Sequence, residues 1–229
     1  MPDLTPILQG LVVESSLPLK AIETDFAVDS SGFGKSEIVR WQNARYGRGQ
    51  DKHGWIKVHL MVGVKTNVVT SIEKTGSFAH DGPLLPRLVE RTARNFQLES
   101  VLADKAYSSH KNLQAVSDTG AVPYIPFRRG FTAGKDTSTL WSKLWHYYHL
   151  NRDDFLAHYH LRSNAESTFS MIKAKFGERL RSKTDTAQTN EMLLKVVCHN
   201  ICCVIRSMRE LGLEPTFWAH DAPAQKVPD

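Results

Sequence analysis

Residues 24–29 read Thr-Asp-Phe-Ala-Val-Asp, and residues 100–104 read Ser-Val-Leu-Ala-Asp. Each segment is a short apolar run that ends in an acid, which is typical of a buried strand with a polar residue at its end. Residues 30–32, Ser-Ser-Gly, form a turn signal, so the sequence predicts that the first strand stops there. These two strands indicate the fold class, because helical patterns lie between and after them.

The neighbouring segments extend the same pattern. Residues 55–64 alternate between apolar and polar side chains and predict a strand, and Asn67 marks a tight turn before a second strand at residues 68–73, so a hairpin is expected. Helical spacing at residues 80–95 and 108–118 flanks the strand at 100–104, and a short strand follows at residues 121–125. Strands that alternate with helices predict an α/β fold with a layered sheet. From residue 136 the pattern is helical, including a long segment at residues 187–211.

The length and composition suit a folded globular protein. The chain has 229 residues, of which 41% are hydrophobic and 23% charged. We expect residues 1–20 to be an N-terminal connector or a short helix, residues 21–212 to be the main domain, and residues 213–229 to be a C-terminal tail. Apolar runs are too short to cross a membrane and three cysteines are too few for a disulfide framework, so an intracellular protein is expected.

Basic residues are concentrated in one segment. The net charge of the chain is +5, and residues 35–65 carry seven basic and two acidic side chains. Trp41, Tyr46 and Trp55 are interleaved with them. Cations neutralise phosphates and aromatic rings stack on bases, so the segment is a candidate nucleic-acid contact; the alternative is a solvated loop and edge strand. The candidate DNA-binding residues here are Lys35, Arg40, Arg45, Arg48 and Lys57.

Three acids stand where a sheet and a helix can bring them together. Asp29 and Asp104 each end a strand, and α/β folds place ligands at the carboxyl ends of strands. Taken singly, either aspartate also fits a simple turn at a strand end. Glu166 lies in a helical segment, where Ser163 and Glu166 fit a capping box that would start a helix.

Glu166 has chemically suitable neighbours at helical spacing. On an ideal helix, Tyr159, Arg162, Glu166 and Lys173 fall within a sector of roughly 60°, so they would share one face beside a buried apolar stripe. A helix that began at the capping box would leave Tyr159 and Arg162 outside it, and the shared face would then be less secure.

The residues described above resemble those of a known family. The spacing Tyr159-x2-Arg162-x3-Glu166-x6-Lys173, preceded by the strand that ends in Asp29 and by the residues Ala-Asp-Lys-Ala-Tyr at 103–107, is similar to the DDE transposases of bacterial insertion sequences. The similarity is greatest to the subgroup with a Tyr-Arg-Glu-Lys signature. It extends over roughly residues 22 to 212, including the strand from residue 55 and the His-Asp turn at residues 80–81.

The resemblance implies a ribonuclease-H-like fold, in which helices flank a mixed sheet and a small helical insertion at about residues 127–158 precedes the last catalytic helix. It implies that Asp29, Asp104 and Glu166 are the catalytic acids and hold two Mg²⁺ ions, with Mn²⁺ able to substitute. The family's phosphate-contacting residues map onto Tyr159, Arg162 and Lys173.

The resemblance also implies an activity. The protein would be a polynucleotidyl transferase that cleaves DNA at insertion-sequence ends and transfers the strands to a target. Its partners would be double-stranded DNA and a second copy of the chain in the active complex, and its location would be the cytoplasm, on the nucleoid. Two departures stand out. Only 61 residues separate Asp104 from Glu166, so any inserted subdomain is small. Only 28 residues precede Asp29, which is too few for a substantial N-terminal DNA-binding region and points to a truncated or decayed copy.

Other interpretations remain open from the sequence. The chain is alternatively a catalytically inactive DNA-binding remnant of a transposase, or a ribonuclease-H-like nuclease that does not join strands. Residues 29–36 are one residue away from a phosphate-binding loop, with Asp29 in place of its first glycine. The cysteines and histidine at residues 198–203 offer zinc ligands but better fit buried thiols on an apolar helix. The aromatic residues at 141–148 suit packing of the insertion, or stacking on a flipped base.

Overall fold

The computed structural model describes residues 2–35, 45–46 and 54–212. Within this part of the chain, five strands form one mixed sheet in the order β3-β2-β1-β4-β5. β1 pairs antiparallel with β2 and β2 with β3, whereas β1, β4 and β5 run parallel. The predicted α/β class is confirmed, and the sheet is compatible with a ribonuclease-H-like fold. The strands are β1 (Asp25–Gly34), β2 (Trp55–Gly63), β3 (Val69–Thr75), β4 (Ser100–Ala103) and β5 (Val122–Tyr124).

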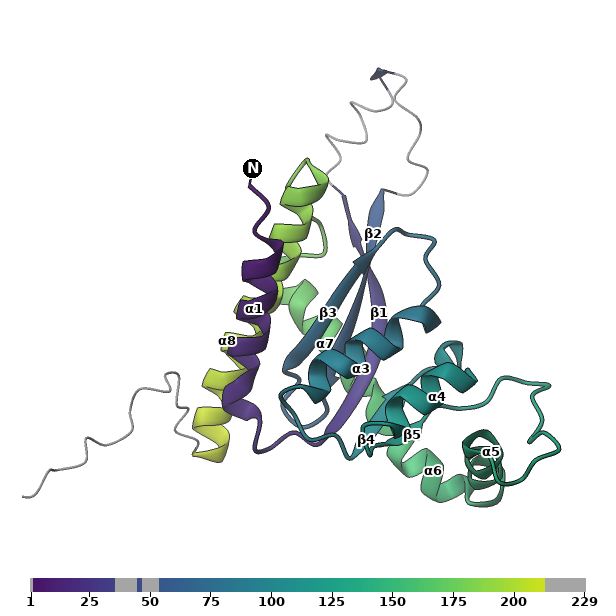
Figure 1. Cartoon of the computed structure of the whole chain (residues 1–229). Coiled ribbons are helices and arrows are strands. Elements are labelled where there is room, and N and C mark those ends of the chain that lie inside the picture. Colours follow the sequence, from purple (N-terminus) through teal and green to yellow (C-terminus); the bar gives the residue numbers. More distant parts are fainter. Residues whose placement is uncertain (1, 36–44, 47–53, 213–229) are drawn as a thin grey trace, which may run out of the picture.

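Helices cover both faces of the sheet. α3 (Leu85–Ala93) and α4 (His110–Ser117) lie on one face, and α1 (Thr5–Ser16), α7 (Ser163–Phe176) and α8 (Asp185–Leu211) lie on the other (Figure 1). α5 (Leu140–Leu150) and α6 (Arg152–Tyr159) stand between β5 and α7 in the chain. Short 3₁₀ turns are η1 (Leu17–Leu19), η2 (Gly82–Leu84), η3 (Lys105–Tyr107) and η4 (His160–Arg162). Among the described helices, none is both long and apolar enough to cross a membrane.

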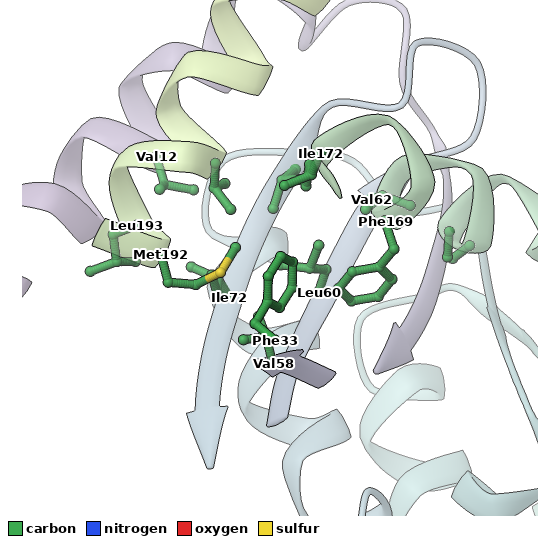
Figure 2. Packing of buried hydrophobic residues seen from close by; sticks show 14 of the residues in the cluster. Val12, Phe33, Val58, Leu60, Val62, Ile72, Phe169, Ile172, Met192 and Leu193 are labelled. Carbon is green, nitrogen blue, oxygen red and sulfur yellow. The ribbon is translucent and has the colours of Figure 1, made fainter. Parts of the chain in front are cut away.

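The alternation of side chains along the strands divides the core in two. Phe33 and Leu60 point to the side of α7 and α8, where they pack with Phe169 in one cluster (Figure 2). Phe26 and Met61 point to the side of α3 and α4 and belong to the other cluster. Because residues one position apart in a strand face opposite sides, both faces of the sheet are apolar and both are covered.

The first strand runs further than the sequence predicted. Residues 30–32 continue β1 instead of ending it, since they pair with residues 57–59 of β2. Gly32 fits there because it lies against the ring of Trp55: a Cβ at Gly32 would come within 2.8 Å of a ring carbon. The long antiparallel partner therefore overrides the local turn preference. Because residues 29–34 are extended, they do not form the phosphate-binding loop considered above.

The predicted hairpin is confirmed. Asn67 turns the chain between β2 and β3 with a φ of 63°. The buried carboxylate of Glu23 accepts hydrogen bonds from the backbone N–H groups of Lys65 (3.2 Å) and Thr66 (2.5 Å), which fixes the turn against the segment before β1. Burial raises the pKa of Glu23.

The N-terminal segment is packed into the domain. α1 lies along α8 and buries Leu8 and Val12 in the core. Of the two expectations for this segment, residues 5–16 form the helix. The predicted C-terminal tail, residues 213–229, lies outside the described residues.

Candidate active site

The parallel pairing of β1 with β4 brings two acids to one edge of the sheet. Val28 pairs with Ala103 at the last position of this ladder, and Asp29 and Asp104 are the next residues of the two segments. Neighbouring strands are about 4.8 Å apart, so residues distant in the sequence leave the ladder side by side. The side chain of Asp104 also accepts a hydrogen bond from the backbone N–H of Lys105 (2.6 Å), so it caps the turn η3 as well.

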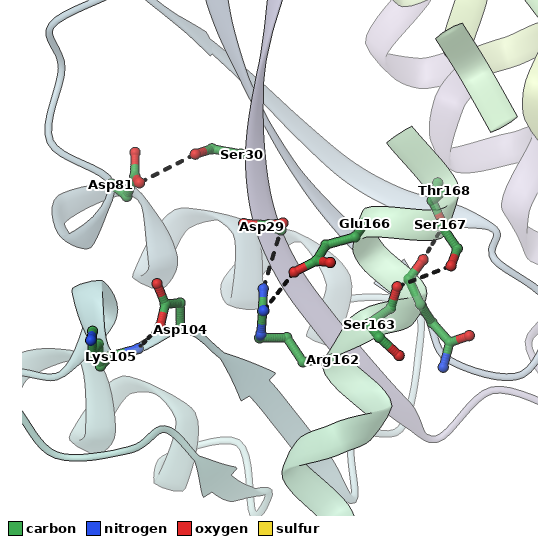
Figure 3. A network of polar contacts seen from close by, with 11 residues as sticks. Asp29, Ser30, Asp81, Asp104, Lys105, Arg162, Ser163, Glu166, Ser167 and Thr168 are labelled. Atoms are coloured by element: carbon green, nitrogen blue, oxygen red, sulfur yellow. Dashed lines mark hydrogen bonds and ion pairs between the residues drawn. The ribbon is translucent and has the colours of Figure 1, made fainter. Parts of the chain in front are cut away.

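α7 supplies the third acid. Glu166 lies in the first turn of α7, and its Oε1 accepts a hydrogen bond from Nη2 of Arg162 (2.6 Å). Nη1 of the same guanidinium is 3.6 Å from Oδ2 of Asp29 (Figure 3). Arg162 therefore bridges Asp29 and Glu166. The side chains of Arg162 and Asp29 are 20% and 21% exposed, whereas that of Glu166 is 56% exposed.

The three carboxylates influence one another electrostatically. Burial raises the pKa of Asp29, the charges of Glu166 and Asp104 raise it further, and the backbone of Ser30 and the charge of Arg162 oppose this. Burial disfavours the charged form of Arg162, but its interactions with Tyr159, Glu166 and Asp29 outweigh burial and raise its pKa. The guanidinium of Arg162 thus lies between Asp29 and Glu166, and the charge of Asp104 also acts on Asp29.

The other residues of the signature lie along the same edge. The Arg162 guanidinium lies over the ring of Tyr159, 5.8 Å from its centre. Lys173, two turns beyond Glu166 on α7, donates a hydrogen bond to Oγ of Ser31 on β1 (2.7 Å). Tyr159, Arg162 and Glu166 are therefore connected to one another, and Lys173 contacts the strand that carries Asp29.

The capping box predicted as an alternative does not form. Ser163 has helical dihedral angles (φ −56°, ψ −19°), and α7 has no side-chain cap. The chain passes from α6 through η4 into α7 in helical conformation, so Ser163 lies within a continuous helical run and no exposed helix start needs a cap there. Tyr159 and Arg162 consequently stay close to Glu166.

A second polar cluster lies on the other side of β1 from Arg162 and Glu166 (Figure 3). Asp81 forms an ion pair with Lys57, accepts a hydrogen bond from Oγ of Ser30 (3.2 Å) and lies 3.6 Å from Nδ1 of His59 (Figure 3 shows Asp81 and Ser30). Lys57, which the sequence proposes for DNA contact, is thus engaged by a carboxylate, and its side chain is 18% exposed. The sequence analysis included the His-Asp turn at residues 80–81 in the resemblance but did not assign Asp81 a contact in the site.

Arg128 supports the turn that follows Asp104. It donates hydrogen bonds to the backbone carbonyls of Lys105 (3.1 Å) and Ala106 (2.6 Å). Tyr107 at the end of this turn is buried, and its pKa is raised by burial and by the neighbouring carboxylates. No spacing pattern in the sequence indicates the contact of Arg128, because it joins a loop after β5 to a turn after β4.

The basic segment predicted to contact DNA is described only in part. Lys35 directly follows β1, and Arg45 is an exposed residue. Arg40 and Arg48 lie outside the described residues.

The donor chemistry of the three acids suits a hard divalent cation. Carboxylate oxygens are the ligands that Mg²⁺ prefers. Within the described ranges, however, no group of three histidine, cysteine, aspartate or glutamate side chains is arranged so that it could hold a metal ion. The Arg162 guanidinium contacts two of the three carboxylates. The site therefore offers suitable ligands, but their side chains are not arranged around a single point.

The structure also tests what the sequence predicts for the cysteines at residues 198–203 and for the aromatic residues at 141–148. Cys203 is buried and burial raises its pKa to about 12, which fits the predicted buried thiol, but Cys198 is exposed, so that prediction was wrong for it. Trp141 is buried and packs edge-on against Phe127, with ring centres 4.7 Å apart, as the packing interpretation predicts.

Comparison with known proteins agrees with the geometry. Residues 20–201 match the family described as transposase DDE domain, and this range includes Asp29, Asp104 and Glu166. The chain matches none of the curated proteins that were compared with it. The matched range covers most of the chain, so this protein belongs to the family with a transposase DDE domain.

Proposed function

We propose that this protein is a transposase of the bacterial insertion-sequence type, a polynucleotidyl transferase that cleaves DNA at the element's ends and joins the strands to a target. Its family membership supports a role in DNA transposition. The observation that carries the proposal is that three acids from distant segments lie near one another: Asp29 and Asp104 directly follow the last pair of the β1–β4 ladder, and Glu166 is linked to Asp29 through Arg162. The Tyr-Arg-Glu-Lys spacing supports the subgroup.

In this proposal Asp29, Asp104 and Glu166 hold Mg²⁺, or Mn²⁺ in its place. The bound metal would neutralise charge on the scissile phosphate and activate water or a 3′-hydroxyl. The side chain of Glu166 is 56% exposed, so its rotation away from Arg162 would release its carboxylate. The Nη2 of Arg162 would then be available to a phosphate, while Nη1 stays near Asp29.

DNA contacts extend from the acids along the same edge. Tyr159, Arg162 and Lys173 face the backbone around the scissile bond, and Lys35 and Arg45 belong to the basic segment that contacts the flanking duplex. Synapsis of two element ends makes the active complex a homodimer.

The decisive experiment compares Asp104→Asn with the control Asp118→Asn at the end of α4. The amide keeps an oxygen that can accept the hydrogen bond from Lys105, so the turn is retained while a charged ligand is lost. With Mg²⁺ or Mn²⁺, Asp104→Asn should abolish nicking and strand joining of a duplex that carries the DNA flanking the coding region. Binding of that duplex should stay at the wild-type level. Undiminished nicking by Asp104→Asn would overturn the proposal.

Metal binding supplies a readout that does not depend on catalysis. Titration of Mn²⁺ followed by electron paramagnetic resonance should show binding to the wild-type protein and weaker binding to Glu166→Gln. The control Glu178→Gln, which changes an exposed acid beyond α7, should bind Mn²⁺ as the wild type does. Equal Mn²⁺ binding by all three proteins would remove Glu166 from the ligand set.

The same assays distinguish the alternatives. A wild-type protein that binds DNA but does not cleave it with Mn²⁺ would be an inactive remnant. Cleavage without joined products would indicate a nuclease of the ribonuclease-H type.

Lys173 provides a separate test of the DNA-contact surface. If its ammonium neutralises one phosphate, Lys173→Met should weaken DNA binding and reduce the slope of log affinity against log salt by about 0.9. Lys143→Met on α5 should leave the slope unchanged. An unaltered slope for Lys173→Met would exclude the contact.

A further inference from the structure

α8 is apolar on the side that faces away from the sheet. Its exposed residues there recur at steps of four, three, four and three: Leu194, Cys198, Ile201, Ile205 and Met208. The four larger side chains are 44%, 47%, 46% and 39% exposed, respectively, and all of them are aliphatic or thioether groups. We call these five residues the α8 stripe.

The opposite side of α8 is already packed. Leu193 and Val196 are buried there against the sheet and α1, and Val204 is buried with Leu19 and Val68. A surface helix ordinarily carries polar residues on its outer face, and a helix that is apolar all round is covered on all sides. We therefore expect the outer face of this 27-residue helix to be covered by another protein surface.

The spacing of the α8 stripe indicates what kind of contact it makes. Alternating steps of three and four are the a and d positions of a coiled-coil seam, where one helix packs along another. The exposed charges of α8 near this region, Arg206, Arg209 and Glu210, lie at its C-terminal end and outside the stripe. A second helix with the same apolar stripe would meet it without opposing like charges.

Further apolar side chains are exposed on the helix next to α8. α1 lies beside α8 (Figure 1), and contributes Ile7 and Leu11, which are 64% and 44% exposed. Together with Leu211 and the four larger residues of the stripe, they make seven large apolar side chains on these two helices that are each at least 39% exposed.

We propose that the α8 stripe is a homodimer interface, in which it packs against the same stripe of a second copy of this chain. A two-fold axis through the middle of the stripe places Ile201 next to its own counterpart, because Leu194 and Met208 are each seven residues away from it. No residue of the stripe contacts the three acids among the interactions of the described residues. The inference therefore stands independently of the proposed chemistry.

Sedimentation velocity of the full chain tests the interface. The wild-type protein should sediment as a dimer that dissociates only on dilution. The double variant Ile201→Glu/Ile205→Glu should be monomeric at concentrations where the wild type is dimeric, with an unchanged circular dichroism spectrum. The control Leu150→Glu, which places a charge at an exposed leucine of α5, should remain dimeric.

Disulfide trapping tests the same contact without adding charge. In a Cys198→Ser/Cys202→Ser background, Ile201→Cys should form a covalent dimer under mild oxidation, and Leu150→Cys should not. The cross-linking experiment still tests the interface if the glutamate variant fails to fold. A monomeric wild-type protein, together with an Ile201→Cys variant whose introduced thiol resists alkylation, would show that another part of the chain covers the stripe, and would overturn the proposal. A dimer that persists in the glutamate variant, or absence of the Ile201→Cys cross-link, would do the same.

Discussion

Asn200 connects three elements of the domain, and its replacement by alanine should destabilise the fold by about 3 to 5 kcal/mol. The side chain is fully buried on α8. Its amide nitrogen donates to the backbone carbonyls of Val12 in α1 (3.2 Å) and Val69 in β3 (2.8 Å), and to Oγ of Ser15 (3.1 Å). Its oxygen accepts a hydrogen bond from the N–H of Val69 (2.8 Å).

The magnitude follows from these contacts. Each lost hydrogen bond costs about 0.5 to 1.5 kcal/mol, and a buried N–H left without a partner, here that of Val69, costs about 1 to 3 kcal/mol. In a protein of this size, a loss of 1 kcal/mol lowers the melting temperature by roughly 2 to 4 °C, so Asn200→Ala should melt about 10 °C below the wild type.

Urea unfolding followed by circular dichroism measures this loss directly. Asn164→Ala on α7 is the matched control, because its side-chain amide donates only to the backbone carbonyl of Leu161 (2.9 Å) near the surface. It should cost less than about 1 kcal/mol. A similarly small loss for Asn200→Ala would refute the argument that this amide holds α1 and α8 to the edge of the sheet.

Two further perturbations test the sheet around β2. Burial lowers the pKa of His59 to about 4. As the pH falls below about 6.5, the unfolded chain therefore binds a proton that the folded chain does not bind. The free energy of unfolding should consequently fall by roughly 3 kcal/mol between pH 6.5 and 4. Urea unfolding at both pH values should show this loss in the wild type and little of it in His59→Gln. Gly63→Ala would place a Cβ 2.7 Å from Oε1 of the buried Glu23, so it should lower the free energy of unfolding by about 1 to 3 kcal/mol. Gly76→Ala, which has open space around it, should be near neutral in the same assay. Equal losses of stability in the two variants would contradict the clash.

Much of the fold could be predicted because its signals are local. The apolar runs before Asp29 and Asp104 lie in β1 and β4, and the hairpin is marked by alternation in β2 and by Asn67. The long helix α8 likewise follows from its periodicity. These patterns depend on residues a few positions apart, which is the range over which burial on one side or the other of a strand or helix is encoded.

Errors occurred where a distant partner outweighed a local preference. Residues 30–32 have the composition of a turn, yet β2 supplies their hydrogen bonds and keeps them extended. Ser163 has the spacing of a cap, yet α6 and η4 already lead helically into α7. In each case the local signal was real, but a neighbouring element removed the need for it.

For the candidate site, the sequence by itself determined which acids follow apolar runs and which residues have the signature spacing, and so it named Asp29, Asp104, Glu166 and Arg162 as candidates. Only the tertiary structure decided that Arg162 joins Asp29 to Glu166 and that Asp81 engages Lys57. Periodicity fixes which face of an element a residue occupies. Which charge meets which depends on how separate elements pack, because an ion pair forms only where two side chains from those elements come within a few ångströms of each other.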